Sequence, residues 1–206
     1  MADQGGKAHW DGVYAAKAPD EVSWYQARPD TSLALIARSG KGTEARLIDV
    51  GGGASRLVDH LLEAGYRRLT VLDLSDVALG RARARLGGRG PLVTWLAADV
   101  TSWTPAGAFD LWHDRAVFHF LVGAEDRRRY LAALAAALPP GAQAILGTFA
   151  SDGPERCSGL PVMRYEPETL ALEVGPSFRL VEGLKEDHLT PSGKLQRFQF
   201  SRFVRV

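Results

Sequence analysis

The sequence predicts an α/β fold with a Rossmann-like, mostly parallel sheet of seven strands, helices on both faces and an antiparallel last strand. Short apolar runs alternate with helical patterns from about residue 44 onward, which is typical of βαβ units. A run of glycines follows the first apolar run, and two alternating runs joined by a turn close the chain. The 206 residues fit one domain of ordinary size, so we expect a single domain over 1–206.

The first part of the alternating region predicts three strands and two helices. Gly65 is a suitable C-cap for the first helix. The Ser75 hydroxyl can accept a hydrogen bond at the N-terminus of the second helix, and Gly87 and Gly88 stop that helix. The expected strands are 45–50, 69–72 and 92–97, and the expected helices are 54–64 and 75–86.

The rest of the chain predicts four strands and three helices. Glu125 and Asp126 suit a helix N-terminus, and the turn Pro139–Gly141 ends that helix. A loop over 151–163 follows the fifth strand, and residues 1–43 are expected to hold one helix behind an aromatic-rich arm. The expected strands are 109–113, 142–149, 179–188 and 196–206, and the expected helices are 30–39, 125–138 and 167–174.

The composition predicts a cytoplasmic protein without a membrane or nucleic-acid partner. The formal net charge is +1, so no overall field attracts either surface. The first 30 residues lack the apolar core of a signal peptide, and no apolar run approaches a membrane span. The single cysteine, Cys157, excludes an internal disulfide. A basic run on the helix 75–86 and just after it is interpreted as a solvated face: Arg81, Arg83, Arg85 and Arg89.

The sharpest local feature is a strand that runs into Gly51, Gly52 and Gly53 and then into a helix. Glycine permits positive φ and has no Cβ, so a ligand can lie against this backbone. The N-terminus of the helix offers free N–H groups to ligand acceptors. The alternative is a tight turn without a ligand, but a turn needs only one glycine. The segment therefore indicates a site for a nucleotide-like ligand.

Three acidic residues narrow the identity of that ligand. Asp49 precedes the glycines inside the strand, where a carboxylate suits a cationic group better than a pyrophosphate. Asp73 closes the second strand and can accept hydrogen bonds from ribose hydroxyls. Asp99 follows the third strand and can accept from an adenine amino group while Val100 packs on the ring. Arg56 occupies the third glycine position of the dinucleotide fingerprint, which disfavours NAD(P) and an oxidoreductase.

With these features the sequence resembles the class I S-adenosylmethionine (SAM)-dependent methyltransferases over nearly its whole length. The segment Asp49–Gly53 resembles the first motif of the family, and Asp73 and Asp99 resemble its ribose-side and adenine-side acids. The terminal pair of strands is similar to the sixth and seventh strands of the family. The resemblance implies SAM as the cofactor, S-adenosylhomocysteine (SAH) as the product, and a SAM-binding core over 44–150. The expected cofactor-binding residues of this core are Asp49, Gly51, Gly52, Gly53, Asp73, Leu74, Asp99 and Val100.

The N-terminal segment, with His9–Tyr14 and Glu21–Tyr25, resembles a subgroup that includes lysine methyltransferases of citrate synthase and of an elongation factor. The resemblance implies that residues 1–43 fold over the cofactor and that 151–206 supply the substrate loop and the terminal pair. Trp10, Tyr14 and Trp24 are therefore expected to bind the cofactor, since aromatic faces stabilise a nearby cation. The alternative is that these rings only pack the arm against the domain.

Candidates for the chemistry lie at the end of the fourth strand. Buried polar groups need partners, so His113, Asp114, Arg115 and His119 are expected to interact with one another. Asp114 is the first choice as a base or substrate anchor, His119 is a second candidate base, and His113 completes the set. The alternative is that an Asp114–Arg115 or Asp–His pair only stabilises the loop. We expect no metal, because methyl transfer from a sulfonium needs none.

The predicted function is transfer of a methyl group from SAM to an N, O or S atom of a small molecule. A protein lysine methyltransferase is the second interpretation, and a non-catalytic SAM-binding module that regulates a partner is the third. The expected partner is a small-molecule acceptor, with a protein substrate as the alternative. The expected oligomeric state is a monomer or homodimer.

Overall fold

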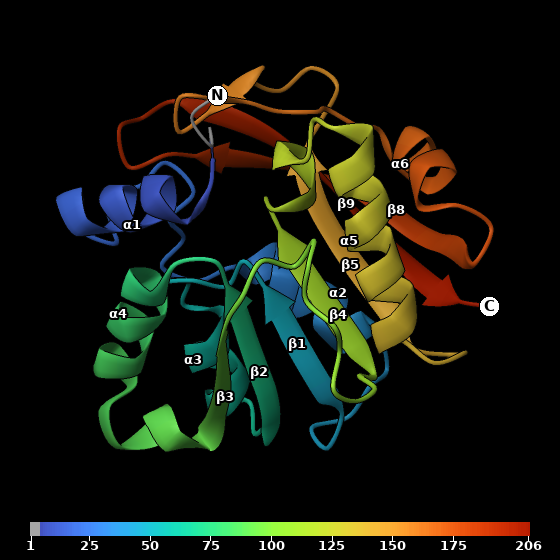
Figure 1. Ribbon diagram of the computed structural model, residues 1–206, viewed down its shortest axis with the longest axis horizontal. Coiled ribbons are helices and arrows are strands. Elements are labelled where there is room, and N and C mark those ends of the chain that lie inside the picture. The colour runs from blue at the N-terminus through green and yellow to red at the C-terminus, as the bar shows by residue number, and fades with distance from the viewer. Residues whose placement is uncertain (1–4) are drawn as a thin grey trace.

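The computed structural model describes residues 5–206 and is built around a seven-stranded sheet (Figure 1). The strands of this sheet are β1 (Arg46–Val50), β2 (Arg68–Asp73), β3 (Val93–Ala97), β4 (Leu111–Arg115), β5 (Gln143–Phe149), β8 (Phe178–Leu189) and β9 (Leu195–Arg205). Their order is β3-β2-β1-β4-β5-β9-β8. Strands β1 to β5 are parallel, and β9 is antiparallel to both β5 and β8. The predicted fold class is therefore confirmed.

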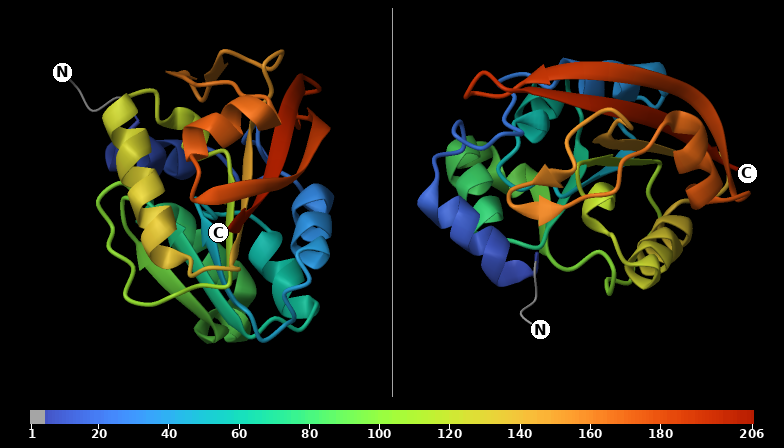
Figure 2. Two further views of the ribbon diagram at one scale, coloured as in Figure 1. Left: turned by 90° about the vertical axis from the view of Figure 1, so that its right-hand side faces the viewer. Right: turned by 90° about the horizontal axis from the view of Figure 1, so that it is seen from above.

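Helices cover both faces of the sheet (Figure 2, left). The α-helices are α1 (Lys7–Ala16), α2 (Asp30–Arg38), α3 (Leu57–Glu63), α4 (Asp76–Leu86), α5 (Ala124–Ala137) and α6 (Pro167–Val174), and the 3₁₀ turns are η1 (Gly87–Leu92) and η2 (Phe118–Phe120). Side chains of α2, α3 and α4 share one apolar cluster with one face of the sheet, while α5 and α6 pack on the other face. In the part of the chain that the structure describes, no helix is long and apolar enough to span a bilayer.

The topology places a ligand-binding edge between β1 and β4. After β1 the chain builds β2 and β3 on one side and then returns to add β4 on the other side. At such a switch point the connecting loops diverge, and a crevice forms outside the carboxyl ends of the strands. The register pairs Asp49 with His113 and Val50 with Asp114 across this point.

Strand β4 sends its last four side chains to opposite faces of the sheet, because successive residues of a strand alternate. Trp112 and Asp114 point toward α5, where both contact Tyr130. His113 points toward α2, where it contacts Ser32, and Arg115 lies on the same side as His113. This alternation determines which polar side chains of β4 lie on the same face of the sheet as the crevice.

Two predicted elements have wrong limits, and one predicted loop contains strands. Strand β4 covers 111–115 rather than 109–113, since its register with β1 begins at Leu111. Helix α3 begins at Leu57, because the turn after the glycines extends to Arg56. The loop 151–163 contains a hairpin of β6 (Arg156–Cys157) and β7 (Leu160–Pro161).

The arm also contains a helix, α1, that was not expected. Gly12 lowers helix propensity there, so the segment is stabilised by contacts with α4. The Asp11 carboxylate accepts a hydrogen bond from Ser75 Oγ at 2.6 Å, and Lys7 pairs with Asp76. Both partners lie at the start of α4, far away in the sequence.

A substitution at Gly147 tests the packing between β5 and β9. It pairs with Phe200, and a Cβ at residue 147 would lie 2.7 Å from a ring carbon of Phe200. We expect Gly147→Ala to lower the free energy of unfolding by about 1–3 kcal/mol, because the buried ring cannot move without strain. Gly107→Ala is the matched control, since an added Cβ meets nothing within 4 Å there. Urea denaturation measures both, and an unchanged midpoint for Gly147→Ala would contradict this packing.

Candidate functional site

The carboxyl ends of β1, β2, β3 and β4 border a cavity of about 540 Å³, here called the main cavity. Its volume is in the range of small-molecule sites. Residues of helix α1 and of the β6–β7 hairpin line it as well. The predicted cofactor residues that line the main cavity are Trp10, Tyr14, Trp24, Gly51, Asp73, Leu74, Asp99 and Val100.

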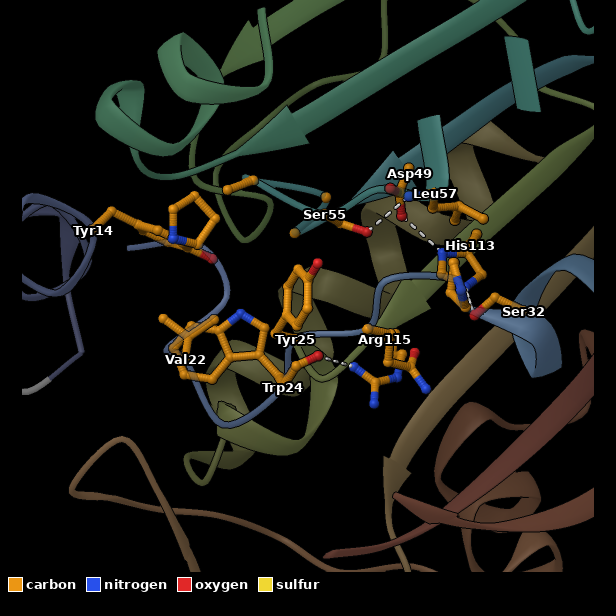
Figure 3. A pocket seen from close by; sticks show the side chains of 16 residues that line it. Tyr14, Val22, Trp24, Tyr25, Ser32, Asp49, Ser55, Leu57, His113 and Arg115 are labelled. Carbon is orange, nitrogen blue, oxygen red and sulfur yellow. Dashed lines mark hydrogen bonds and ion pairs between the residues drawn. The ribbon is translucent and has the colours of Figure 1, made fainter. Parts of the chain in front are cut away.

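A second, narrower pocket of about 50 Å³, here called the side pocket, lies against the glycine turn (Figure 3). Asp49 and Gly52 border it, together with residues of the arm and of α2. It shares four lining residues with the main cavity, namely Tyr14, Trp24, Gly51 and Arg115. The two spaces therefore meet along one wall.

The three glycines are required partly by the protein itself. A Cβ at Gly52 would lie 2.5 Å from Asp49 Oδ2, and one at Gly53 would lie 2.8 Å from Asp73 Oδ2. Gly51 has a φ of 69°, and a Cβ there would lie 2.0 Å from a methyl group of Val117. The turn thus brings two carboxylates against bare backbone, in addition to any close approach by a ligand.

Asp49 is buried and hydrogen-bonded rather than free. Its Oδ1 lies 2.7 Å from His113 Nδ1, and His113 Nε2 lies 2.9 Å from Ser32 Oγ (Figure 3). Because an ionised carboxylate only accepts, the imidazole Nδ1–H donates to Asp49. His113 therefore links β1 to α2, and both of its nitrogens have partners.

Asp73 ends β2 in the wall of the main cavity. Its Oδ1 accepts a hydrogen bond from the Ser75 N–H at 2.8 Å. Burial raises the pKa of the Asp73 carboxyl to about 7, and the negative charge of Asp49 acts in the same direction. Tyr14 lies beside it, and burial also raises the pKa of that phenol.

Asp99 and Val100 form the far side of the main cavity, next to β3. The Asp99 side chain is exposed, and its Oδ1 accepts from the N–H and the hydroxyl of Thr101, both at 2.8 Å. Val100 is buried in the apolar cluster. Leu74 is half-buried and lines the same cavity, so an apolar slot lies beside the Asp99 carboxylate.

Asp114 lies on the other face of β4 and lines neither space. Its carboxylate accepts from the N–H groups of Val117 and Phe118 at 2.8 and 3.0 Å, and from the Tyr130 hydroxyl at 2.6 Å. Burial raises the pKa of Asp114 to about 6. These bonds stabilise the turn after β4, in which Ala116 has a φ of 75°.

His119 is also fully buried outside the cavity wall. Its Nδ1 accepts from the Phe149 N–H at 3.2 Å, and its ring packs among Phe120, Phe149 and Phe198. Burial lowers the pKa of His119 to about 3, and the nearby Arg115 charge acts in the same direction. His119 is therefore neutral at physiological pH.

The expected polar cluster at the end of β4 does not form. His113 contacts Asp49 and Ser32, whereas Asp114 contacts backbone and Tyr130. Arg115 points away from Asp114, and its Nη1 donates to the Trp24 carbonyl at 2.9 Å. The expectation of mutual contacts was wrong because adjacent strand residues point to opposite faces.

The aromatic residues of the arm lie close to where the main cavity and the side pocket adjoin. Trp10 packs edge-on against Trp24 and Phe120, with ring centroids 5.8 and 5.0 Å apart, and Tyr14 also contacts Trp24. The arm is held in place there by polar contacts to its backbone. Arg115 binds the carbonyl of Trp24, and His188 Nε2 lies 2.7 Å from that of Ser23.

Two arginines near the site were not among the expected site residues. Arg85, expected on a solvated face, donates to the carbonyls of Ala54 and Ser55 and pairs with Asp59, so it braces the glycine turn. Arg115 was expected only in a loop cluster, yet it lines both the main cavity and the side pocket. The glycine turn and the helix 75–86 are distant in sequence, so no local pattern indicated the first contact.

Comparison with known proteins agrees with this geometry. Residues 47–141 match the model of a family described as a methyltransferase domain. The structure also superposes on that of an N-methyltransferase, NodS from Bradyrhizobium japonicum in complex with SAH. The TM-score is 0.72 at 19% identity, with 95% of this chain and 97% of that chain covered. The chain therefore has the fold of a SAM-dependent methyltransferase, and a little under half of its sequence matches a methyltransferase domain. SAM is the cofactor of this family.

Two further proteins that are similar to this chain have names that indicate different kinds of substrate. The 1,6-didemethyltoxoflavin-N1-methyltransferase from Burkholderia thailandensis, bound to its substrate and SAH, gives a TM-score of 0.70 at 25% identity, covering 97% of this chain and 84% of that one. The eEF1A lysine and N-terminal methyltransferase of Danio rerio is 24% identical over 148 residues, or 70% of this chain and 21% of that protein. The chain spans about a fifth or less of the length of the curated relatives it matches.

The raised pKa of Asp73 predicts a pH-dependent stability in the absence of ligand. The folded carboxyl holds its proton up to about pH 7, whereas the unfolded one loses it near its ordinary pKa of 3.8. Asp73 therefore makes the protein less stable as pH rises between these values. We expect the stability gained by Asp73→Asn to grow by on the order of 2–3 kcal/mol from pH 5 to pH 7 and then to level off.

Chemical denaturation at a series of pH values measures this difference. Asp99→Asn is the control, since that carboxylate borders the same cavity but is exposed. Parallel pH profiles for the wild type and Asp73→Asn would contradict the buried, proton-holding Asp73.

Proposed function

We propose that this chain is a SAM-dependent methyltransferase that acts on a small molecule, with residues 1–206 working as one domain. The observation that carries the proposal is the composition of the main cavity. It has two carboxylates and an apolar slot at one end, and an aromatic cluster under a roof at the other. The first end suits adenosine and the second suits a sulfonium with its methyl acceptor.

Four side chains at the adenosine end are proposed to contact the ribose and the adenine. Asp73 is placed to accept from ribose hydroxyls, and Asp99 from the adenine amino group. Leu74 and Val100 supply the apolar walls on which a flat base packs. These residues fit the cofactor because this end of the cavity combines hydrogen-bond acceptors with apolar side chains.

The methyl-transfer end is proposed to position the reactants and to exclude water. SAM supplies a methyl group already activated by its sulfonium. The rings of Trp10, Tyr14 and Trp24 stabilise positive charge near their faces. The α1 helix and the β6–β7 hairpin close the site above, which favours an in-line approach of the acceptor.

A small acceptor fits the roofed cavity better than a lysine of a folded protein. Phe120, Cys157 and Leu160 form the wall on the acceptor side, and the last two are buried residues of the hairpin itself. A protein lysine would need an open groove across this roof. The similarity to the zebrafish eEF1A methyltransferase supports the second candidate, a protein lysine methyltransferase.

Asp114, His113 and His119 are proposed to act as positioning residues rather than as bases. The oxygens of Asp114 and both nitrogens of His113 are engaged with protein groups, and His119 is buried behind the wall. This arrangement favours an acceptor that can attack the methyl group without first losing a proton to the protein. Because no base is required, a non-catalytic SAM-binding module is a third candidate.

A transfer assay distinguishes these candidates. The chain is incubated with methyl-tritiated SAM and a cell extract, and the products are separated by ultrafiltration. We expect the label in a small-molecule product, and Leu74→Arg to abolish it by filling the adenosine end of the cavity. Label on protein would favour the lysine methyltransferase, and SAM binding without any transfer would favour the binding module.

The role of His119 is tested by the pH dependence of turnover. We expect His119→Gln to lower stability by about 1–3 kcal/mol, because the ring fills a buried aromatic cluster. The shape of the kcat–pH profile should stay the same, since the side chain does not exchange protons with the acceptor. Loss of one limb of that profile in the variant would restore His119 as a base.

A further inference from the structure

The acceptor end of the main cavity is walled by aromatic and apolar side chains. Trp10 packs edge-on against Phe120 and Trp24, with ring centroids 5.0 and 5.8 Å away, and all three residues line the cavity. Cys157 and Leu160 of the β6–β7 hairpin line it as well, and both are buried. These groups offer an acceptor much apolar contact and few hydrogen bonds, so they fit a small apolar molecule.

The charges around this end of the cavity do not suit a cationic acceptor. The charged residues that line the main cavity, within the described range 5–206, are Lys7, Asp73, Asp99, Arg115 and Asp126. Asp73 and Asp99 lie at the adenosine end, and Asp126 is exposed. The buried charge at the acceptor end is the Arg115 guanidinium, which lies near Cys157, while its partner Glu186 does not line the cavity. An ammonium group would therefore lose its hydration there without gaining a carboxylate.

The titratable side chains near the acceptor end are not placed to take a proton from the acceptor. Burial raises the pKa of the Cys157 thiol to about 11, so this thiol keeps its own proton at neutral pH. Burial also raises the pKa of the Tyr14 phenol. Asp114 and His119 are buried outside the cavity lining. The acceptor must therefore reach the methyl group with its nucleophilic lone pair already free.

An aromatic thiol meets these requirements, because it ionises in water near neutral pH. An alkyl amine carries a proton on its nitrogen at that pH, and an alcohol keeps its proton. Attack by a thiolate on a sulfonium cancels two opposite charges, and the attraction between them is stronger beside an apolar wall than in water. Sulfur also packs favourably against aromatic rings such as Trp10 and Phe120. A ring nitrogen has a free lone pair too, but its methylated product would stay cationic near Arg115.

We propose that the methyl acceptor is a small aromatic thiol, bound as its thiolate against the wall of Trp10, Phe120, Cys157 and Leu160. This inference rests on the proposed function and names its substrate class. The thiol releases its proton to water before it binds. A lone pair of the thiolate sulfur then forms the bond to the methyl carbon, while the bond from that carbon to the sulfonium breaks and leaves its electron pair on the sulfur of SAH. A thiolate and a sulfonium are thus converted into two neutral thioethers.

A panel of acceptors that share a six-membered aromatic ring tests this inference on the wild-type chain. The chain is assayed with SAM and benzenethiol, aniline, benzylamine or pyridine, each against a blank without protein, and the products are identified by mass spectrometry. We expect methyl phenyl sulfide from benzenethiol, with kcat/KM at least about 100-fold above that of the other three.

The pH dependence shows where the proton of the thiol goes. Phenylmethanethiol carries the same ring but is a weaker acid than benzenethiol. We expect the rise of kcat/KM with pH to lie at a higher pH for phenylmethanethiol, because the thiol ionises in water and the protein supplies no base. The same midpoint for both thiols would show a protein base and overturn the inference.

A carboxylate introduced into the wall should repel the thiolate. We expect Leu160→Asp to lower kcat/KM for benzenethiol by about 10-fold or more, with SAM affinity in isothermal titration kept, since Leu160 belongs to the acceptor wall. Leu172→Asp is the matched control, because Leu172 is 84% exposed on α6 and does not line the cavity. Wild-type turnover of benzenethiol by a Leu160→Asp variant that binds SAM would contradict the placement of the acceptor.

The panel separates failure of this inference from failure of the proposed function. Preferred methylation of aniline, benzylamine or pyridine overturns the thiol class, and so does a chain that binds SAM but methylates neither thiol. Both results leave the proposed function intact. If the chain binds no SAM in the titration, the proposed function fails and the inference fails with it.

Discussion

The hydrogen bonds of His113 to Asp49 and Ser32 are the interaction on which the rest of the site depends. They join β1, β4 and α2 at the point where the sheet opens, and all three groups are buried. The Asp49 carboxylate is held against the backbone of Gly52, which leaves no room for a side chain there. Because α2 directly follows the arm in the chain, the same link helps to place the arm over the glycine turn.

Because the side chains of β4 alternate, those on one face of the sheet stabilise the structure and those on the other face line the cavities. Asp114, on the α5 face, collects three hydrogen bonds and stabilises a turn with a positive φ at Ala116. Arg115, on the α2 face, reaches the space where the arm and the glycine turn meet. A buried carboxylate and a buried guanidinium thus stand next to each other in sequence without pairing.

The fold was predictable because its signals are local and periodic. Alternating apolar runs and the glycine turn were enough to predict a mostly parallel sheet of seven strands with an antiparallel end. The positions of Asp73 and Asp99 at the cavity also followed, since the carboxyl ends of parallel strands share one edge of the sheet.

The partners of the polar residues were not predictable, because they depend on register and on long-range packing. A shift of two residues in the limits of β4 moved Asp114 and Arg115 from the loop into the strand, and alternation then sent them to opposite faces. Helix α1 and the bracing of the glycine turn by Arg85 depend on contacts with α4 and the turn itself, across tens of residues. Hydrophobic periodicity carries no information about such contacts.

A crystal structure of the chain with SAH tests the central claim most directly, namely that one crevice between β1 and β4 holds the whole cofactor. We expect ribose oxygens at hydrogen-bond distance from Asp73, the adenine between Leu74 and Val100, and the sulfur near the aromatic rings of Trp10, Tyr14 and Trp24. SAH bound with its ribose away from Asp73, or with its amino-acid end directed toward Asp99, would contradict it.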